Sequence, residues 1–150
     1  MDRPTALEDK LAIHELLNRY ATMVDQRRWE LMDEVFAPGA TLDYRSTGGQ
    51  AGPYRETLEW LDRALAPWPL NLHFISNVSI EMNGDEATSH CYFHAPMGRV
   101  EPDGSQRVIT NAGTYEDDLV RTDRGWRIAK RHCEQRIMVG QLPEGYVIPE

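Results

Sequence analysis

The sequence is poor in the features that mark several protein classes. It contains two cysteines, Cys91 and Cys133, without a CxxC pair or a regular cysteine spacing. This excludes a disulfide-rich scaffold and favours a reducing, cytoplasmic compartment, although one bridge between the two cysteines stays open. Acidic residues interrupt every apolar run of the N-terminal stretch MDRPTALEDKLAIHELL, so we expect neither a signal peptide nor a membrane span there.

Basic charge is also scarce. Lys and Arg number 16 against 24 Asp and Glu, which gives a formal net charge of -8. Such a surface repels nucleic-acid phosphates and anionic membranes. We therefore expect no nucleic-acid partner and no membrane partner, and look instead for a small-molecule ligand.

Several catalytic signatures are missing as well. No serine lies in a G-x-S-x-G turn, and no glycine-rich phosphate loop follows a strand, so a nucleotide cofactor is not expected. His90 and His94 in HCYFH resemble a metal-ligand pair, but on a strand they would lie about 13 Å apart. We expect no metal and no cofactor. General acid–base chemistry remains, for which a neutral imidazole is well suited.

The first half of the chain has helical spacing. Its 150 residues are enough for one domain with a sizeable core, so we predict a single domain over residues 1–150. Thr5 and Glu8 form a capping-box pattern, which predicts the start of a long first helix. WELMDEVFAPG predicts a short second helix that ends at Pro38 and Gly39, ATLDY a strand, and residues 53–65 a third helix.

The second half alternates like a sheet. Strands are predicted over residues 70–82, 87–97, 107–120 and 126–138, with turn sequences between them. Short connections imply antiparallel neighbours. We therefore predict an α+β fold, a cone-shaped α+β barrel in which three N-terminal helices pack on a curved, mostly antiparallel sheet and enclose a pocket.

Polar residues follow one face of several predicted strands. His90, Tyr92 and His94 share a face, as do Asn111 and Tyr115, and as do Arg131 and Cys133. If these faces point inward, they supply the polar groups of the pocket. A shift of register by one residue would instead place them in solvent.

One histidine stands within an apolar strand, LNLHFISN, as residue 73. His73 is either a core histidine bonded to a backbone carbonyl or a catalytic base. Asp25, at the end of the first helix, is either a solvated helix end or a carboxylate at the rim of the pocket. The sequence pattern does not decide between the two interpretations of His73, or between the two of Asp25.

Three segments together carry a family resemblance. AIHELLNRYATMVDQRRWELMDEVFAPGATLDY, HFISNVSIE and TYEDDLVRTDRGWRIAKRHCE resemble the SnoaL-like branch of the nuclear transport factor 2-like superfamily, from about Leu7 to Gln135. By motif, the chain resembles its cofactor-free lyases: scytalone dehydratase, bile-acid dehydratase and hexachlorocyclohexane dehydrochlorinase. The fold itself hosts many unrelated functions.

The resemblance implies roles for particular residues. His73 and Asp25 match the catalytic dyad of these lyases, Tyr20 and Tyr44 match two tyrosines of bile-acid dehydratase, and Arg131 matches a pocket arginine. The alternatives are packing alone for the two tyrosines and, for Arg131, an ion pair with a carboxylate of a neighbouring strand. His94 resembles a second pocket histidine and joins Asn111, Tyr92, Tyr115 and Cys133 as expected substrate-binding residues.

The implied activity is elimination of water from a small, largely apolar or polycyclic hydroxylated molecule. An isomerase or cyclase, a non-catalytic ligand-binding protein, and an assembly protein like the small subunit of ring-hydroxylating dioxygenases are the alternatives. Because the related lyases are often trimers, we expect a homo-oligomer, with a trimer favoured over a dimer.

Overall fold

The computed structural model describes residues 5–150; residues 1–4, the start of the predicted domain, lie outside the described part. Helix α1 (Ala6–Asp25) begins as predicted. The Thr5 hydroxyl accepts a hydrogen bond from the Glu8 amide, and the Glu8 carboxylate accepts one from the Thr5 amide. The apolar face of α1 packs into the core, and Leu17 and Tyr20 on it are almost fully buried.

The other helices are shorter. The predicted second helix is a single 3-10 segment, η1 (Trp29–Glu34), and it ends before the FAPG sequence. Phe36 already pairs with Ile128 in the sheet. Pro38 cannot donate a backbone hydrogen bond and Gly39 has a positive φ of 77°, so neither residue continues a helix. A 3-10 turn, η2 (Arg45–Thr47), and helix α2 (Tyr54–Leu65) follow.

Seven strands form one sheet, in the order β2-β1-β7-β6-β5-β3, with β4 also paired to β5. Only the β1–β7 pair is parallel among the described strands, so the sheet is mostly antiparallel, as predicted. The strands are β1 (Phe36–Asp43), β2 (Ala51–Pro53), β3 (Leu70–Asn71), β4 (Phe74–Asn83), β5 (Glu86–Val100), β6 (Gln106–Thr122) and β7 (Gly125–Val139).

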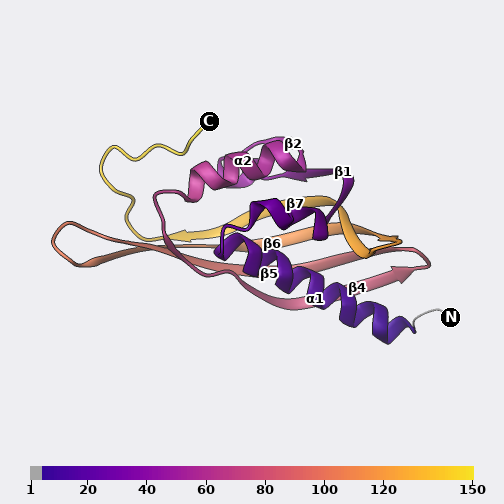
Figure 1. Cartoon of the computed structure of the whole chain (residues 1–150). Helices are drawn as coiled ribbons and strands as arrows, with labels where there is room; N and C mark the ends of the chain where they lie inside the picture. The colour runs from indigo at the N-terminus through magenta and orange to yellow at the C-terminus, as the bar shows by residue number, and fades with distance from the viewer. Residues whose placement is uncertain (1–4) are drawn as a thin grey trace.

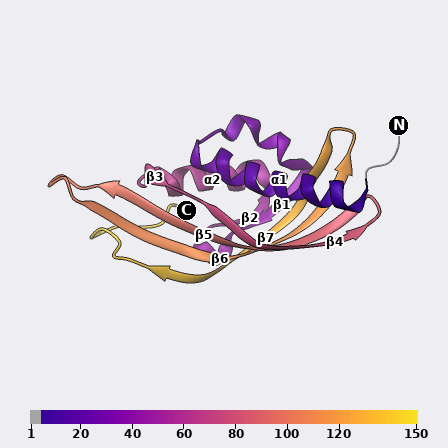
Figure 2. The same cartoon turned by 90° about the horizontal axis from the view of Figure 1, so that it is seen from below.

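The helices and the sheet form two layers. The long strands β5, β6 and β7 run side by side across the molecule (Figure 1). Figure 2 shows α1 and α2 on the same side of this sheet, which curves beneath them without closing into a barrel. The core therefore lies between the helices and one face of the sheet.

The predicted strand 70–82 is interrupted. Leu72 still donates its amide hydrogen to the Pro96 carbonyl oxygen at 3.1 Å, but the chain then leaves the ladder and rejoins it as β4 at Phe74. His73 lies in this gap between β3 and β4. Across residues 5–150, no helix is both long and apolar enough to pass through a membrane.

Candidate active site

A cavity of about 210 Å³ lies between α2, the sheet and the C-terminal segment. Its wall is mainly apolar, with Leu61 and Leu65 from α2, Phe93 from β5 and Ile109 from β6 among its residues. The polar side chains that reach it include those of His73, Tyr20, Tyr44 and Asn111. A mainly apolar cavity with a few polar groups is typical of a small-molecule site.

His73 and Asp25 form a close pair at this cavity. His73 Nδ1 lies 2.7 Å from Asp25 Oδ1, and the His73 backbone amide donates to Asp25 Oδ2 at 2.9 Å. The His73 side chain is 8% exposed and that of Asp25 is 18% exposed. Among the described strands, β3 and β4 pair with β5 alone, so an amide that points away from β5 has no strand partner, and the Asp25 carboxylate supplies one. Since Nδ1 is engaged by Asp25, Nε2 is the ring nitrogen left for a ligand.

Two further side chains support Asp25. Asn71 Nδ2 donates to Asp25 Oδ1 at 2.8 Å, and Arg27 Nη2 donates to Asn71 Oδ1 at 2.7 Å. Sequence reasoning missed both residues. The sequence holds only a weak signal for them: Asn71 lies two positions before His73, and Arg27 lies two positions after Asp25.

Tyr20 and Tyr44 meet at the cavity wall. Their hydroxyl oxygens are 2.5 Å apart, and both side chains are almost fully buried. Burial raises the pKa of Tyr20 and raises that of Tyr44 well above its usual value, although the charge of Arg131 acts in the opposite direction on both. Both phenols therefore stay protonated at neutral pH; one donates to the other in their shared hydrogen bond, which leaves the second O–H to donate elsewhere.

Tyr115 completes an aromatic cluster behind this pair. Its ring stacks on Phe93 at 4.6 Å between centroids and meets Tyr20 edge-on at 5.8 Å. Burial also raises the pKa of Tyr115 well above its usual value. Tyr115 also lines the cavity.

Arg131 differs from the expected pocket arginine. It is absent from the cavity wall and makes a bidentate ion pair with Asp117, two bonds of 2.7 Å between fully buried side chains. Its guanidinium lies 4.3 Å from the Tyr20 ring centroid and 4.0 Å from that of Tyr115, so these rings separate it from the ligand space. The contact with a ligand that we predicted for Arg131 is corrected to a supporting position behind the aromatic wall.

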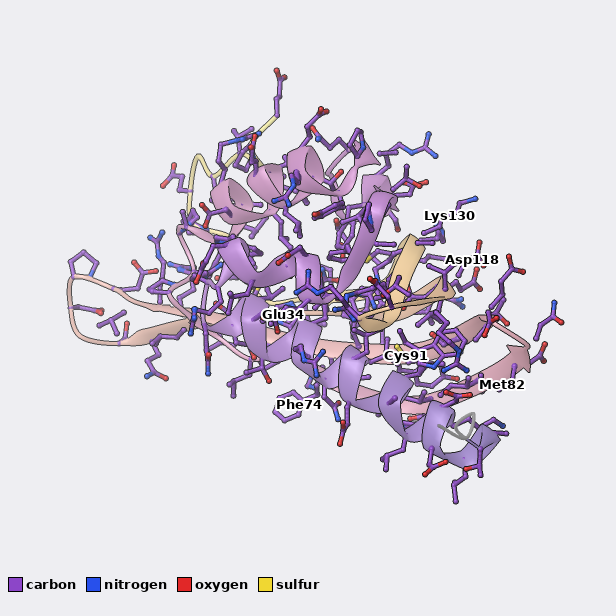
Figure 3. The ribbon with its side chains drawn as sticks, turned by 45° about the vertical axis from the view of Figure 1, so that its right-hand side comes forward. Glu34, Phe74, Met82, Cys91, Asp118 and Lys130 are labelled. Atoms are coloured by element: carbon purple, nitrogen blue, oxygen red, sulfur yellow. The ribbon has the colours of Figure 1, made fainter. Side chains whose placement is uncertain are left out.

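Tyr92 and His94 also lie elsewhere than expected. The register of β5 turns Cys91, Phe93 and Ala95 toward the core, which leaves Tyr92 and His94 on the outer face, with Tyr92 48% exposed. The sticks in Figure 3 show Phe74, the β4 partner of His94, projecting away from the body of the molecule. The prediction that Tyr92 and His94 bind substrate inside the pocket is therefore wrong in its placement.

Asn111 and Cys133 also line the cavity. Both cysteines are free thiols, and burial raises the pKa of Cys91 to about 11 and that of Cys133 to about 12. A thiol that stays protonated is a poor nucleophile and a poor metal ligand. In the part of the chain that the structure describes, no group of three or more His, Cys, Asp or Glu side chains is arranged to hold a metal ion.

The architecture identifies the fold of the protein. An open curved sheet covered on one face by helices, with a cavity between the layers, is the nuclear transport factor 2-like fold. The chain belongs to the SnoaL-like domain family, whose model matches residues 5–132.

Individual relatives agree with this assignment. The chain is 38% identical over 135 residues to the uncharacterized protein Rv2910c of Mycobacterium tuberculosis strain H37Rv, a match that covers 88% of this chain and 90% of that protein. It also resembles the crystal structure of the Kfla4162 protein of Kribbella flavida, with 25% identity, a TM-score of 0.79, and coverage of 90% of this chain and 95% of the other.

A hexachlorocyclohexane dehydrochlorinase from Novosphingobium barchaimii LL02 has the same fold, with 18% identity and a TM-score of 0.74. The match covers 95% of this chain and 97% of that structure. At this identity the likeness concerns the fold, so the activity must be argued from the side chains of the cavity.

Proposed function

We propose that this protein is a cofactor-independent lyase that eliminates water from a small, largely apolar hydroxylated substrate. The observation that carries the proposal is the His73–Asp25 pair, 2.7 Å between Nδ1 and Oδ1, at the wall of a mainly apolar cavity. A carboxylate in this position orients the imidazole and stabilises the imidazolium that forms when the ring accepts a proton.

The elimination uses groups that already lie at the cavity. His73 Nε2 accepts the proton from a carbon beside a carbonyl or an aromatic ring, and the electrons of that C–H bond form the new double bond. The C–O bond breaks, and a hydroxyl of Tyr20 or Tyr44 protonates the leaving oxygen, so that it departs as water. The proton on His73 then returns to the tyrosine, and no oxidant or reductant is consumed.

The volume of the cavity limits the size of the substrate. An apolar cavity of about 150 Å³ is large enough for benzene, so about 210 Å³ suits a molecule of one or two rings. Asn111 gives this molecule a polar partner, and its Oδ1 is buried without a hydrogen bond to any residue in the described range 5–150. A donor group on the substrate, such as a hydroxyl, would complement this oxygen.

The proposal is tested with a panel of one- and two-ring β-hydroxy ketones, in which loss of water creates a conjugated product visible by ultraviolet absorbance. For His73→Ala we expect kcat to fall by about 10²–10⁴-fold, because the base is removed, while ligand binding and the fold persist. His94→Ala is the matched control, since His94 lies on the outer face, and it should leave kcat unchanged.

Other outcomes separate the alternatives. Full activity of His73→Ala would contradict the dyad proposal. Exchange of the carbon-bound proton with deuterated solvent, without loss of water, would indicate the isomerase alternative. Binding that is equally tight in both variants, with no turnover or exchange, would indicate a ligand-binding protein. The expected homo-oligomer, trimer before dimer, stays a prediction.

A further inference from the structure

The support of Asp25 begins at an unusual backbone position. Arg27 has a positive φ of 55° at the end of α1, where the Arg27 amide bonds to the Val24 carbonyl and the Arg28 amide to the Met23 carbonyl. This hydrogen-bond pattern commonly has glycine at the position that Arg27 occupies, since a side chain there is strained. A strained residue that is not glycine suggests that its side chain has a role.

The Arg27 side chain reaches three acceptor oxygens through one nitrogen. Nη2 carries two hydrogens: one is shared between the carbonyl oxygens of Leu65 at 3.1 Å and Trp68 at 3.0 Å, and the other is donated to Asn71 Oδ1 at 2.7 Å. The first two hold the connection between α2 and β3 against the end of α1. The third fixes which way round the Asn71 amide lies, because a guanidinium can only donate and must therefore face the amide oxygen.

The orientation of Asn71 then determines that of Asp25. With Oδ1 of Asn71 bonded to Arg27, its NH₂ group points to Asp25 Oδ1 at 2.8 Å. The His73 backbone amide donates to the other oxygen of Asp25 at 2.9 Å. Neither donor can accept a hydrogen bond, so both carboxylate oxygens act as acceptors, and the contact with His73 Nδ1 is satisfied when the proton is on Nδ1.

We propose that Arg27 and Asn71 are positioning residues that, through Asp25, hold His73 as the Nδ1–H tautomer with the lone pair of Nε2 available to the cavity. The inference rests on the proposed function for its catalytic meaning, since a base needs that lone pair. Its structural content, the tautomer of His73, is independent of any substrate.

The chain offers closely matched variants. Asn71→Asp keeps the shape of the side chain and an acceptor for Arg27, but removes the NH₂ donor toward Asp25. Arg27→Met removes the donor-only group, whereas Arg27→Lys retains a charged donor. Arg28→Met is the control, because Arg28 is an exposed neighbour whose side chain pairs with Glu30.

The experiment is nitrogen-15 NMR of the histidine rings in the full chain, without ligand, at a pH where the imidazoles are neutral. The His73 signals are assigned with His73→Gln. In the unmodified protein we expect a protonated Nδ1, an unprotonated Nε2 and a slowly exchanging Nδ1 hydrogen. In Asn71→Asp and Arg27→Met we expect that hydrogen to exchange at least tenfold faster, with Nε2–H tautomer appearing, and Arg27→Lys and Arg28→Met to resemble the unmodified protein.

An unchanged His73 tautomer and exchange rate in folded Asn71→Asp would overturn the inference, even if Arg27→Met fails to fold. An equal acceleration in Arg28→Met would also overturn it, because the effect would then be a general loosening of the chain. Absence of turnover on every substrate, combined with the expected NMR result, would refute the lyase proposal and still support the positioning roles of Arg27 and Asn71.

Discussion

At the scale of single residues, the site depends on which groups can only donate a hydrogen bond and which can only accept one. His73 is held by a carboxylate on one side of its ring, while the Tyr20 and Tyr44 hydroxyls approach each other across the cavity wall. A base and a neutral acid in one mainly apolar cavity are the minimum for elimination of water. The charge of Arg131 is already matched by Asp117 and acts on the tyrosine rings rather than on a ligand.

The buried tyrosines predict an unusual alkaline titration. Burial raises the pKa of Tyr20, Tyr44 and Tyr115 in the folded protein, whereas in the unfolded chain a tyrosine ionises near pH 10. The stability that comes from keeping these phenols neutral is therefore complete below about pH 10 and is lost as the pH rises further, because the unfolded chain releases protons that the folded protein retains.

The measurement is the tyrosinate absorbance of the protein as the pH is raised from neutral. Of the six tyrosines in the sequence, we expect at least three to stay un-ionised until the protein unfolds cooperatively, as followed by circular dichroism. A smooth ionisation of all six before any unfolding would contradict the buried positions. Tyr92→Phe, a change on the outer face, is the control and should leave the delayed phase intact.

At the scale of elements, irregularities in the strands determine which groups face the cavity. In the gap between β3 and β4, the His73 amide donates to Asp25 rather than to a neighbouring strand. In the β6–β7 pair, Ala112 is opposite Ile137 but Gly113 is opposite Gln135, so Arg136 is an extra residue. This bulge changes the alternation of β7, and both Gln135 and Met138 line the cavity as a result.

Gly113 makes this bulge sterically feasible. A Cβ atom at this position would lie 1.8 Å from the Glu134 carbonyl oxygen, which is backbone and cannot move aside without changing β7. We expect Gly113→Ala to lower the free energy of unfolding by about 3 kcal/mol or more, measured by urea denaturation. Gly98→Ala is the control in the neighbouring strand, since its nearest contact is an ordinary 3.4 Å; equal losses in the two variants would contradict this reason.

At the scale of the whole molecule, the C-terminal segment closes the cavity. Leu142, Tyr146 and Ile148 line it, and the Trp60 indole donates to the Pro149 carbonyl oxygen at 2.8 Å. The Trp68 indole donates to the Tyr146 hydroxyl at 3.3 Å. The segment therefore forms part of the cavity wall in its own chain, and Figure 1 shows the yellow tail turning back from the left-hand end of the sheet toward the side of α2.

A chain that ends at Gly140 tests this closure. Loss of three apolar wall residues should weaken the binding of a small apolar ligand by about tenfold or more, and the emission of Trp60 and Trp68 should move to longer wavelength as water enters. Calorimetry and fluorescence measure the two effects. Val147→Ala, at a side chain that is 79% exposed, is the control; unchanged affinity in the truncated chain would refute closure by the tail.

Much of the fold could be predicted because it follows from local patterns. The capping box at Thr5, the alternation of the second half and the turns between β4, β5, β6 and β7 each depend on residues that are close together in the sequence. The second helix was predicted too long, since the pattern of the FAPG segment did not reveal that Phe36 pairs with distant Ile128. Parallel pairing of that kind has no local signal.

The sequence by itself determined the two-layer α+β architecture, and its family resemblance brought His73 and Asp25 forward as a candidate pair. Only the tertiary structure decided which strand faces point inward, because a shift of one residue exchanges the faces, and this placed Tyr92 and His94 outside. It also decided that Arg131 is paired behind the aromatic wall and that Arg27 and Asn71 support Asp25. These contacts join residues from separate elements, so their geometry exists only once the chain has folded.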